Sequence, residues 1–85
     1  MVLRLMVKRA EDPGSGISAM LWATGEDARL LEWKEFQGEA ALGIWLAGIV
    51  GKYGRGNIKV DWTQQLRADA RLAPLLSILF GTSRG

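Results

Sequence analysis

The chain contains neither cysteine nor histidine. The missing cysteine excludes a disulfide framework, an iron–sulfur site and thiol chemistry. The missing histidine removes the usual general base and the commonest metal ligand, so that a metal would depend on Asp and Glu alone. We therefore expect no cofactor, no metal site and no catalytic residue.

The acidic residues do not replace these groups. Glu11–Asp12 and Glu26–Asp27 fall in predicted turns, and no third acid follows at ligand spacing. Glu32, Glu35 and Glu39 belong to the charged sides of their elements, whereas general acid–base catalysis needs carboxylates in a water-poor pocket. The serines lack a histidine partner that would activate them. The sequence therefore predicts a protein that is not an enzyme.

Long hydrophobic runs are missing as well. The uncharged stretches 40–51 and 72–83 would span roughly 18 Å as helices, against about 30 Å of hydrocarbon in a bilayer. Arg4, Lys8 and Arg9 lie in the region that an export signal keeps apolar. We expect a cytoplasmic protein without a membrane partner.

The size and composition favour one compact domain. The 85 residues are 48% hydrophobic and 24% charged, which is too apolar for a disordered chain. The formal net charge is only +2, and positive and negative residues alternate along the chain. This pattern lacks the dense basic stripe of dedicated nucleic-acid modules.

Period-two alternation predicts the strands. It runs through Val2–Arg9, Ile17–Thr24 and Asn57–Thr63, and turn-forming residues fill Glu11–Gly16 between the first two. The segment Arg29–Phe36 fits either a strand or a helix. We favour the strand, because Trp and Phe suit pleated surfaces.

Helical spacing predicts a central helix over Glu39–Tyr53, with one broad apolar stripe. Its other side carries Gly43, Ala47 and Gly51, and glycine costs roughly 0.5–1 kcal/mol in a helix relative to alanine. We expect this small-residue flank to be hidden against a neighbouring segment. A short amphipathic helix over 64–72 should end near Pro74, because the proline ring cannot continue the hydrogen-bond ladder.

Together these elements predict an α+β fold, a small two-layer sandwich with an antiparallel sheet of three to four strands packed on one central helix. The chain forms a single domain over 1–85. Its parts are a strand meander (1–38), the central helix (39–53), a strand (57–63) and a C-terminal helical segment (64–80).

A partner-binding patch follows from the strand faces. If the helix covers Ile17, Ala19 and Leu21, then Trp22 faces outward among basic and Met side chains, the composition of an interface centre. If the faces are reversed, or if the C-terminal segment folds over it, Trp22 belongs to a core. The predicted partner-binding residues are Arg4, Met6, Lys8, Trp22, Arg29 and Trp33.

The sequence also leaves nucleic-acid binding and self-association as alternatives. Basic residues around one aromatic can touch a phosphate backbone, or can simply favour the negative end of a helix. The residues of this alternative nucleic-acid site are Lys52, Tyr53, Arg55 and Lys59. The apolar excess indicates either that the C-terminal tail packs on the second face of the helix within one chain or that two chains share it, and we predict a homodimer. A further alternative is a structural subunit whose tail docks into a larger complex. The predicted self-association residues are Gly43, Ala47, Gly51, Leu75 and Leu79.

The order of the elements resembles that of some small anti-CRISPR proteins made by phages and mobile elements. The resemblance rests on a short strand, the Asp12–Gly14 turn, further strands through Phe36, an Ala/Gly-rich helix and a final strand. It implies a non-enzymatic inhibitor that occludes a surface of a larger bacterial protein or ribonucleoprotein complex, and a place in the host cytoplasm. No individual functional residue carries over.

Overall fold

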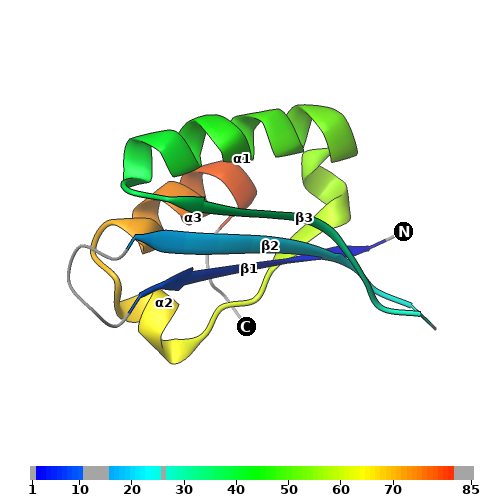
Figure 1. Cartoon of the computed structure of the whole chain (residues 1–85), viewed down its shortest axis with the longest axis horizontal. Coiled ribbons are helices and arrows are strands. Elements are labelled where there is room, and N and C mark those ends of the chain that lie inside the picture. Colours follow the sequence, from blue (N-terminus) through cyan, green and yellow to red (C-terminus); the bar gives the residue numbers. More distant parts are fainter. Residues whose placement is uncertain (1, 11–15, 26, 82–85) are drawn as a thin grey trace.

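The computed structural model describes residues 2–10, 16–25 and 27–81. It is an α+β sandwich in which helices cover one face of a four-stranded sheet (Figure 1), so the predicted fold class is confirmed. In chain order the elements are β1 (Leu3–Arg9), β2 (Ile17–Ala23), β3 (Arg29–Phe36), α1 (Glu39–Tyr53), the 3-10 turn η1 (Arg55–Asn57), β4 (Ile58–Val60), α2 (Gln64–Ala68) and α3 (Leu72–Phe80).

The sheet is mixed, with the strand order β3-β2-β1-β4. Antiparallel pairing joins β1 to β2 and β2 to β3, whereas β4 runs parallel to β1 and pairs Ile58 with Leu3 and Val60 with Leu5. The expectation of a purely antiparallel sheet was wrong for β4. Because α1 carries the chain back across the helical layer, β4 enters the sheet in the direction of β1, as crossover connections require.

The core lies between the helices and one face of the sheet. Two helices line it, because α3, in the predicted C-terminal helical segment, packs beside the central helix α1. The buried strand residues are each at most 5% exposed: Leu3, Leu5, Val7, Ile17, Ala19, Leu21, Phe36 and Ile58. The buried helix residues facing them are Leu42, Leu46 and Ile49 of α1 and Leu72 and Leu76 of α3.

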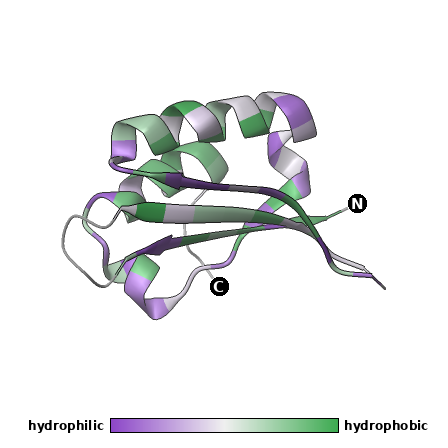
Figure 2. Ribbon diagram, viewed as in Figure 1, coloured by the Kyte–Doolittle hydropathy of each residue, from purple (hydrophilic) through white to green (hydrophobic). Residues whose placement is uncertain are grey.

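The small-residue flank of α1 is only partly covered. A Cβ built on Gly43 would lie 3.6 Å from Leu75 Cδ1 of α3, so one glycine does permit a close approach. Ala47 and Gly51 are exposed, however, and Figure 2 shows few hydrophilic residues between the two ends of α1. The expectation that the whole flank is hidden was therefore wrong within one chain. Leu75 and Leu79 are partly buried against the chain's own core.

The C-terminal segment differs from the prediction at Pro74. This residue does not end a helix; it lies in the first turn of α3, where no backbone donor is lost because those N–H groups have no intrahelical acceptor. The break between the two helices lies earlier in the chain, because α2 ends at Ala68 and Asp69 follows it. Asp69 Oδ1 accepts from the N–H groups of Arg71 at 3.0 Å and Leu72 at 2.9 Å and so caps α3.

The fourth strand is also shorter than predicted. It ends at Val60, and the Thr63 hydroxyl oxygen accepts from Leu66 N–H at 3.1 Å, which makes Thr63 the N-cap of α2. The acidic pair Glu11–Asp12, the Asp12–Gly14 turn and Glu26 lie outside the described residues.

Candidate protein-binding face

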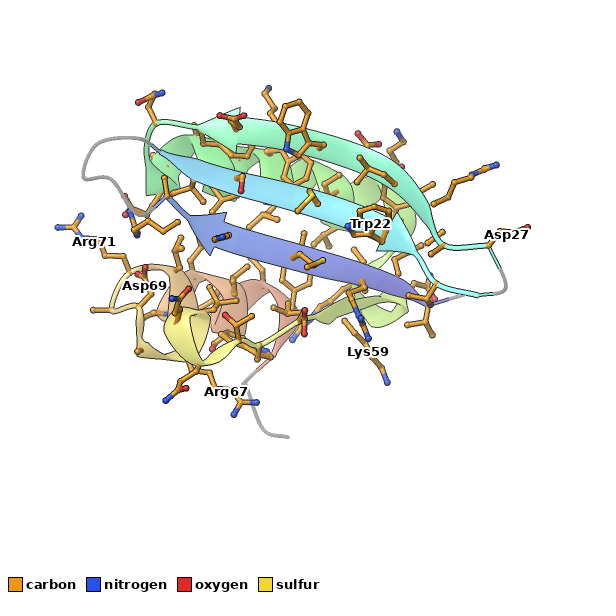
Figure 3. All side chains as sticks on the ribbon, turned by 60° about the horizontal axis from the view of Figure 1, so that its bottom comes forward. Trp22, Asp27, Lys59, Arg67, Asp69 and Arg71 are labelled. Carbon is orange, nitrogen blue, oxygen red and sulfur yellow. The ribbon has the colours of Figure 1, made fainter. Side chains whose placement is uncertain are left out.

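No described helix lies over the sheet face turned away from α1 and α3, and α2 lies beside the β1 edge of the sheet (Figure 3). We call this sheet face the open face. Strand alternation and the cross-strand register place ten residues on it: Arg4, Met6, Lys8, Ser18, Met20, Trp22, Leu30, Trp33, Glu35 and Lys59. Figure 3 shows this face turned toward the viewer, with Trp22 lying across the sheet and α1 behind it.

The centre of the open face is apolar across three strands. Met6 pairs with Met20, and Met20 pairs with Trp33, so these side chains form one row. The neighbouring row joins Trp22 to Leu30, and both Leu30 (44%) and Trp33 (57%) are largely exposed. Contiguous aromatic and Met surface bordered by charge is the composition of protein–protein interface centres.

Basic residues border this centre along β1 and β4. Arg4 stands opposite both Trp22 and Lys59, and Lys8 stands at the other end of β1. Glu35 lies across the sheet, opposite Ser18. The open face therefore carries charge of both signs around an apolar middle, which suits a protein surface that is itself mixed in charge.

Trp22 has an unusual environment. Its indole Nε1 is enclosed and finds no hydrogen-bond acceptor among the described residues. An enclosed donor without an acceptor costs about 1–3 kcal/mol, so Trp22 is held on the face by the packing of its ring and not by its polar edge.

A hollow of about 490 Å³ adjoins the open face beside β1. It exists because β4 stops at Val60 and the chain turns away into α2, leaving the second half of β1 without a neighbouring strand on that side. Met6, Lys8 and Met20 of the open face line the hollow together with Asp61 and Leu66.

An ion cluster closes the far end of the hollow. Arg9 donates to Asp69 Oδ2 at 2.8 Å and to Glu39 Oε1 at 2.7 Å, and so ties β1 to the α2–α3 turn and to the start of α1. The Arg9 guanidinium, helped by the backbone N–H groups of Leu72 and Arg71, lowers the pKa of Asp69 to about 2. Arg9 likewise holds the pKa of Glu39 below its ordinary value.

The structure brings together most of the predicted partner-binding residues. Arg4, Met6, Lys8, Trp22 and Trp33 all lie on the open face. Arg29 does not, because it pairs with Ala23 and therefore lies on the helix side at the end of the sheet.

Alternation places Met20 on the strand face of Trp22, but neither Met20 nor Leu30 was among the predicted partner-binding residues. The position of Leu30 on the open face results from the register shift of β3 opposite Leu21 and Trp22, and no pattern in the sequence indicates this shift.

The alternative nucleic-acid residues do not form one site. Lys52 Nζ lies 2.9 Å from Glu32 Oε2, and the Tyr53 hydroxyl donates to the same oxygen at 2.7 Å. These contacts lower the pKa of Glu32 and raise that of Lys52. Arg55 is exposed in η1, whereas Lys59 lies on the open face of the sheet.

Comparison of the chain with protein-family models, with curated proteins and with solved structures yields no match. No helix in the described part of the chain is long and apolar enough to cross a membrane. Within residues 2–10, 16–25 and 27–81, no three acidic side chains gather where they could hold a metal ion.

Proposed function

We propose that the protein binds another protein through the open face and inhibits it by occluding its surface, without catalysis. The observation that carries this proposal is the apolar row Met6–Met20–Trp33, which crosses three strands and is exposed at Trp33. Large exposed apolar patches on small proteins mark interaction sites, and this one has charged borders that would give specificity.

The face has room for a stable complex. Specific interfaces bury about 800 Å² on each partner, and the molecule extends 36 Å by 24 Å along its longer axes. Trp33 is the expected anchor, because it is the most exposed apolar side chain of this row (57%), and Trp residues that a partner shields from water are common binding hot spots.

The resemblance to anti-CRISPR proteins suggests the first partner to test, a CRISPR ribonucleoprotein of the bacterial host. Surface occlusion needs a rigid patch and no chemistry, and a sheet face provides the rigidity. Phage plaque counts on CRISPR-immune cells that express the chain should rise relative to cells that do not.

The direct test is capture from bacterial lysate with matched variants. Tagged wild type, Trp33→Ala and Ile44→Ala are compared by quantitative mass spectrometry. Ile44 is 77% exposed on α1 and provides the control on the opposite side of the molecule. We expect Trp33→Ala to reduce capture of a specific partner at least tenfold, because truncating a hot-spot Trp costs about 2 kcal/mol or more and a factor of ten corresponds to about 1.4 kcal/mol, and Ile44→Ala to leave it unchanged. Equal capture by all three proteins would exclude the open face.

One observation favours nucleic acid as the second candidate. The open face combines Trp22 and Trp33 with Arg4, Lys8 and Lys59, and single strands bind where bases stack on aromatic rings beside basic residues. Fluorescence anisotropy with a labelled single-stranded oligonucleotide distinguishes the two. Binding at low salt that weakens steeply as salt rises would favour nucleic acid over a protein partner.

A further inference from the structure

The outer edge of β3 has free backbone groups. Backbone bonds from Thr24 to Val2 and from Ala10 to Gly16 show that even-numbered positions of β2 face β1. Odd-numbered residues of β2 therefore bond to β3, and their partners there are Glu32, Lys34 and Phe36. The peptide groups of Trp33 and Glu35 must then point away from the sheet.

No element in the described part of the chain pairs with this edge. β3 ends the strand order, and its exposed side chains include Trp33, Lys34 and Glu35. An uncovered strand edge presents a row of donors and acceptors that another chain can extend.

We propose that a second copy of this chain pairs with this edge, antiparallel, with the two-fold axis at Trp33. Trp33 then exchanges two backbone hydrogen bonds with the partner's Trp33. In this register Glu32 stands opposite the partner's Lys34, and Lys34 opposite the partner's Glu32. We call the two paired β3 edges the seam. Two opposite-charge pairs form on its helix side, and two Trp side chains meet on the open face.

The charges select this register over its neighbours. A shift of the axis to residue 32 places Glu32 opposite the partner's Glu32, and a shift to residue 34 places two lysines together. Like charges directly opposite are destabilising. If the two-fold axis lay between two residues, each outward-pointing peptide group would face a partner residue whose peptide group is already bonded to the partner's β2. Such a register could not form hydrogen bonds across the edge.

The extent of the seam follows from the irregularity in β3. The register between β2 and β3 shifts at Leu21 and Trp22, which leaves an extra residue in β3 at Leu31. Because a bulge bends the strand, pairing is confined to about residues 31–35. So short a seam gives a weak dimer, with Kd on the order of 10 µM.

The helical layer leaves room for this arrangement. Two contacts show which side of α1 faces β3. The ring of Trp45 in α1 lies 5.5 Å from the ring of Phe36 in β3, and Lys52 Nζ in α1 lies 2.9 Å from Glu32 Oε2 in β3. Ala41 and Gly48 lie on this same side of the helix, at helical spacing from Trp45, and both are exposed. Such small residues allow the α1 helices of two copies to approach across the seam, since interhelical distance depends on the side chains at the contact.

Sedimentation equilibrium between about 5 and 500 µM tests the seam. We expect the wild type to dimerise and Lys34→Glu to weaken dimerisation at least tenfold, because Glu32 would then face a second carboxylate. Lys8→Glu makes the same charge change away from the edge and should dimerise as the wild type does. Lys34 lies on the helix side of the sheet, so the substitution itself leaves every side chain of the open face in place.

Cross-linking tests the register itself, because the chain has no cysteine of its own. In the Trp33→Cys variant the two new thiols would lie on residues with Cα atoms about 5.5 Å apart, a distance that permits a disulfide. In the control Leu30→Cys they would be about 20 Å apart along the strands. Oxidation should link the first variant and not the second. A wild type that stays monomeric at 500 µM, or equal linking of the two variants, would overturn the proposal.

Discussion

At the scale of single residues, Gly16 and Gly51 have opposite requirements. Gly16 has φ +96°, and a Cβ there would lie 2.5 Å from the carbonyl oxygen of Phe36. Gly51 lies in α1, and a Cβ there would meet nothing within 4 Å. The same residue type is therefore required at one site and costly at the other.

We predict that Gly16→Ala lowers the free energy of unfolding by about 1–3 kcal/mol, because it forces a strained backbone or moves Phe36. Gly51→Ala should raise it by about 0.5–1 kcal/mol, because alanine is the better helix former. Urea unfolding followed by circular dichroism measures both. Equal effects of the two substitutions would contradict the described backbone at Gly16.

Asp69 makes the stability depend on pH. Its pKa falls from 3.8 to about 2 in the folded protein through its bonds with Arg9 and with the backbone of α3. A carboxyl with a lowered pKa stabilises the fold above its unfolded pKa, and that stabilisation is lost as the pH falls from about 4 to 2. Because the Arg9 side chain is 41% exposed, solvent screening reduces the contribution to about 1 kcal/mol.

Unfolding of the wild type and of Asp69→Asn at pH 7 and pH 2 tests this contribution. The variant should be less stable at pH 7 by about 1 kcal/mol, and most of this difference should disappear at pH 2, which is close to the pKa of Asp69 in the folded protein. A difference that does not change with pH would assign the effect to packing.

Individual side chains were the part least accessible from sequence. The outward placement of Trp22 followed from alternation, once the helix was assigned to the Ala19 face. The pairing of Tyr53 and Lys52 with Glu32 could not be foreseen, because the residues are about twenty positions apart. Nothing local to either segment indicates the contact.

At the scale of elements, Glu32 connects β3 to α1. It accepts from both Tyr53 and Lys52, but the two bonds differ in environment, since the Lys52 side chain is 63% exposed. We predict that Tyr53→Phe lowers the free energy of unfolding by about 1 kcal/mol, the usual worth of a hydrogen bond to a partly shielded carboxylate. Lys52→Met should cost less, because water screens the exposed ammonium.

Thermal and urea unfolding of both variants provide the measurement. The result that would contradict the prediction is a larger loss for Lys52→Met than for Tyr53→Phe. The variants keep the aliphatic or aromatic body of each side chain, so the comparison isolates the polar groups.

The elements themselves were largely predictable, with failures at their ends. Alternation identified β1 and β2, and the apolar stripe identified α1, because period and residue type agree in these segments. Residues 29–36 fit a strand and a helix equally well, and only the preference of Trp and Phe for pleated surfaces favoured the strand that the structure has. Pro74 misled the prediction, since a proline ends one helix and begins another equally well. The parallel direction of β4 depends on the crossover and has no signature within its three residues.

At the scale of the whole molecule, the radius of gyration distinguishes a monomer from the proposed dimer. The Cα value is 12.2 Å, close to the roughly 12 Å expected for a compact chain of this length. Joining two sheets at β3 separates their centres by about 20 Å, given roughly 4.8 Å per strand. Small-angle X-ray scattering should therefore show an increase to about 15–16 Å at high concentration for the wild type, and a smaller increase for Lys34→Glu at the same concentration.

The pairing of β1 with β4 has a consequence for how the chain acquires its structure. Leu3 must meet Ile58 after more than fifty intervening residues have been placed, and contacts of such wide sequence separation form late and slow the search for the native state. The β1–β3 meander precedes it in the chain and is joined by short connections, so we expect its hairpins to be the earlier intermediates. Before β4 pairs with β1, the edge of β1 has unpaired backbone groups. Folding chains at high concentration are therefore most prone to aggregate at this stage.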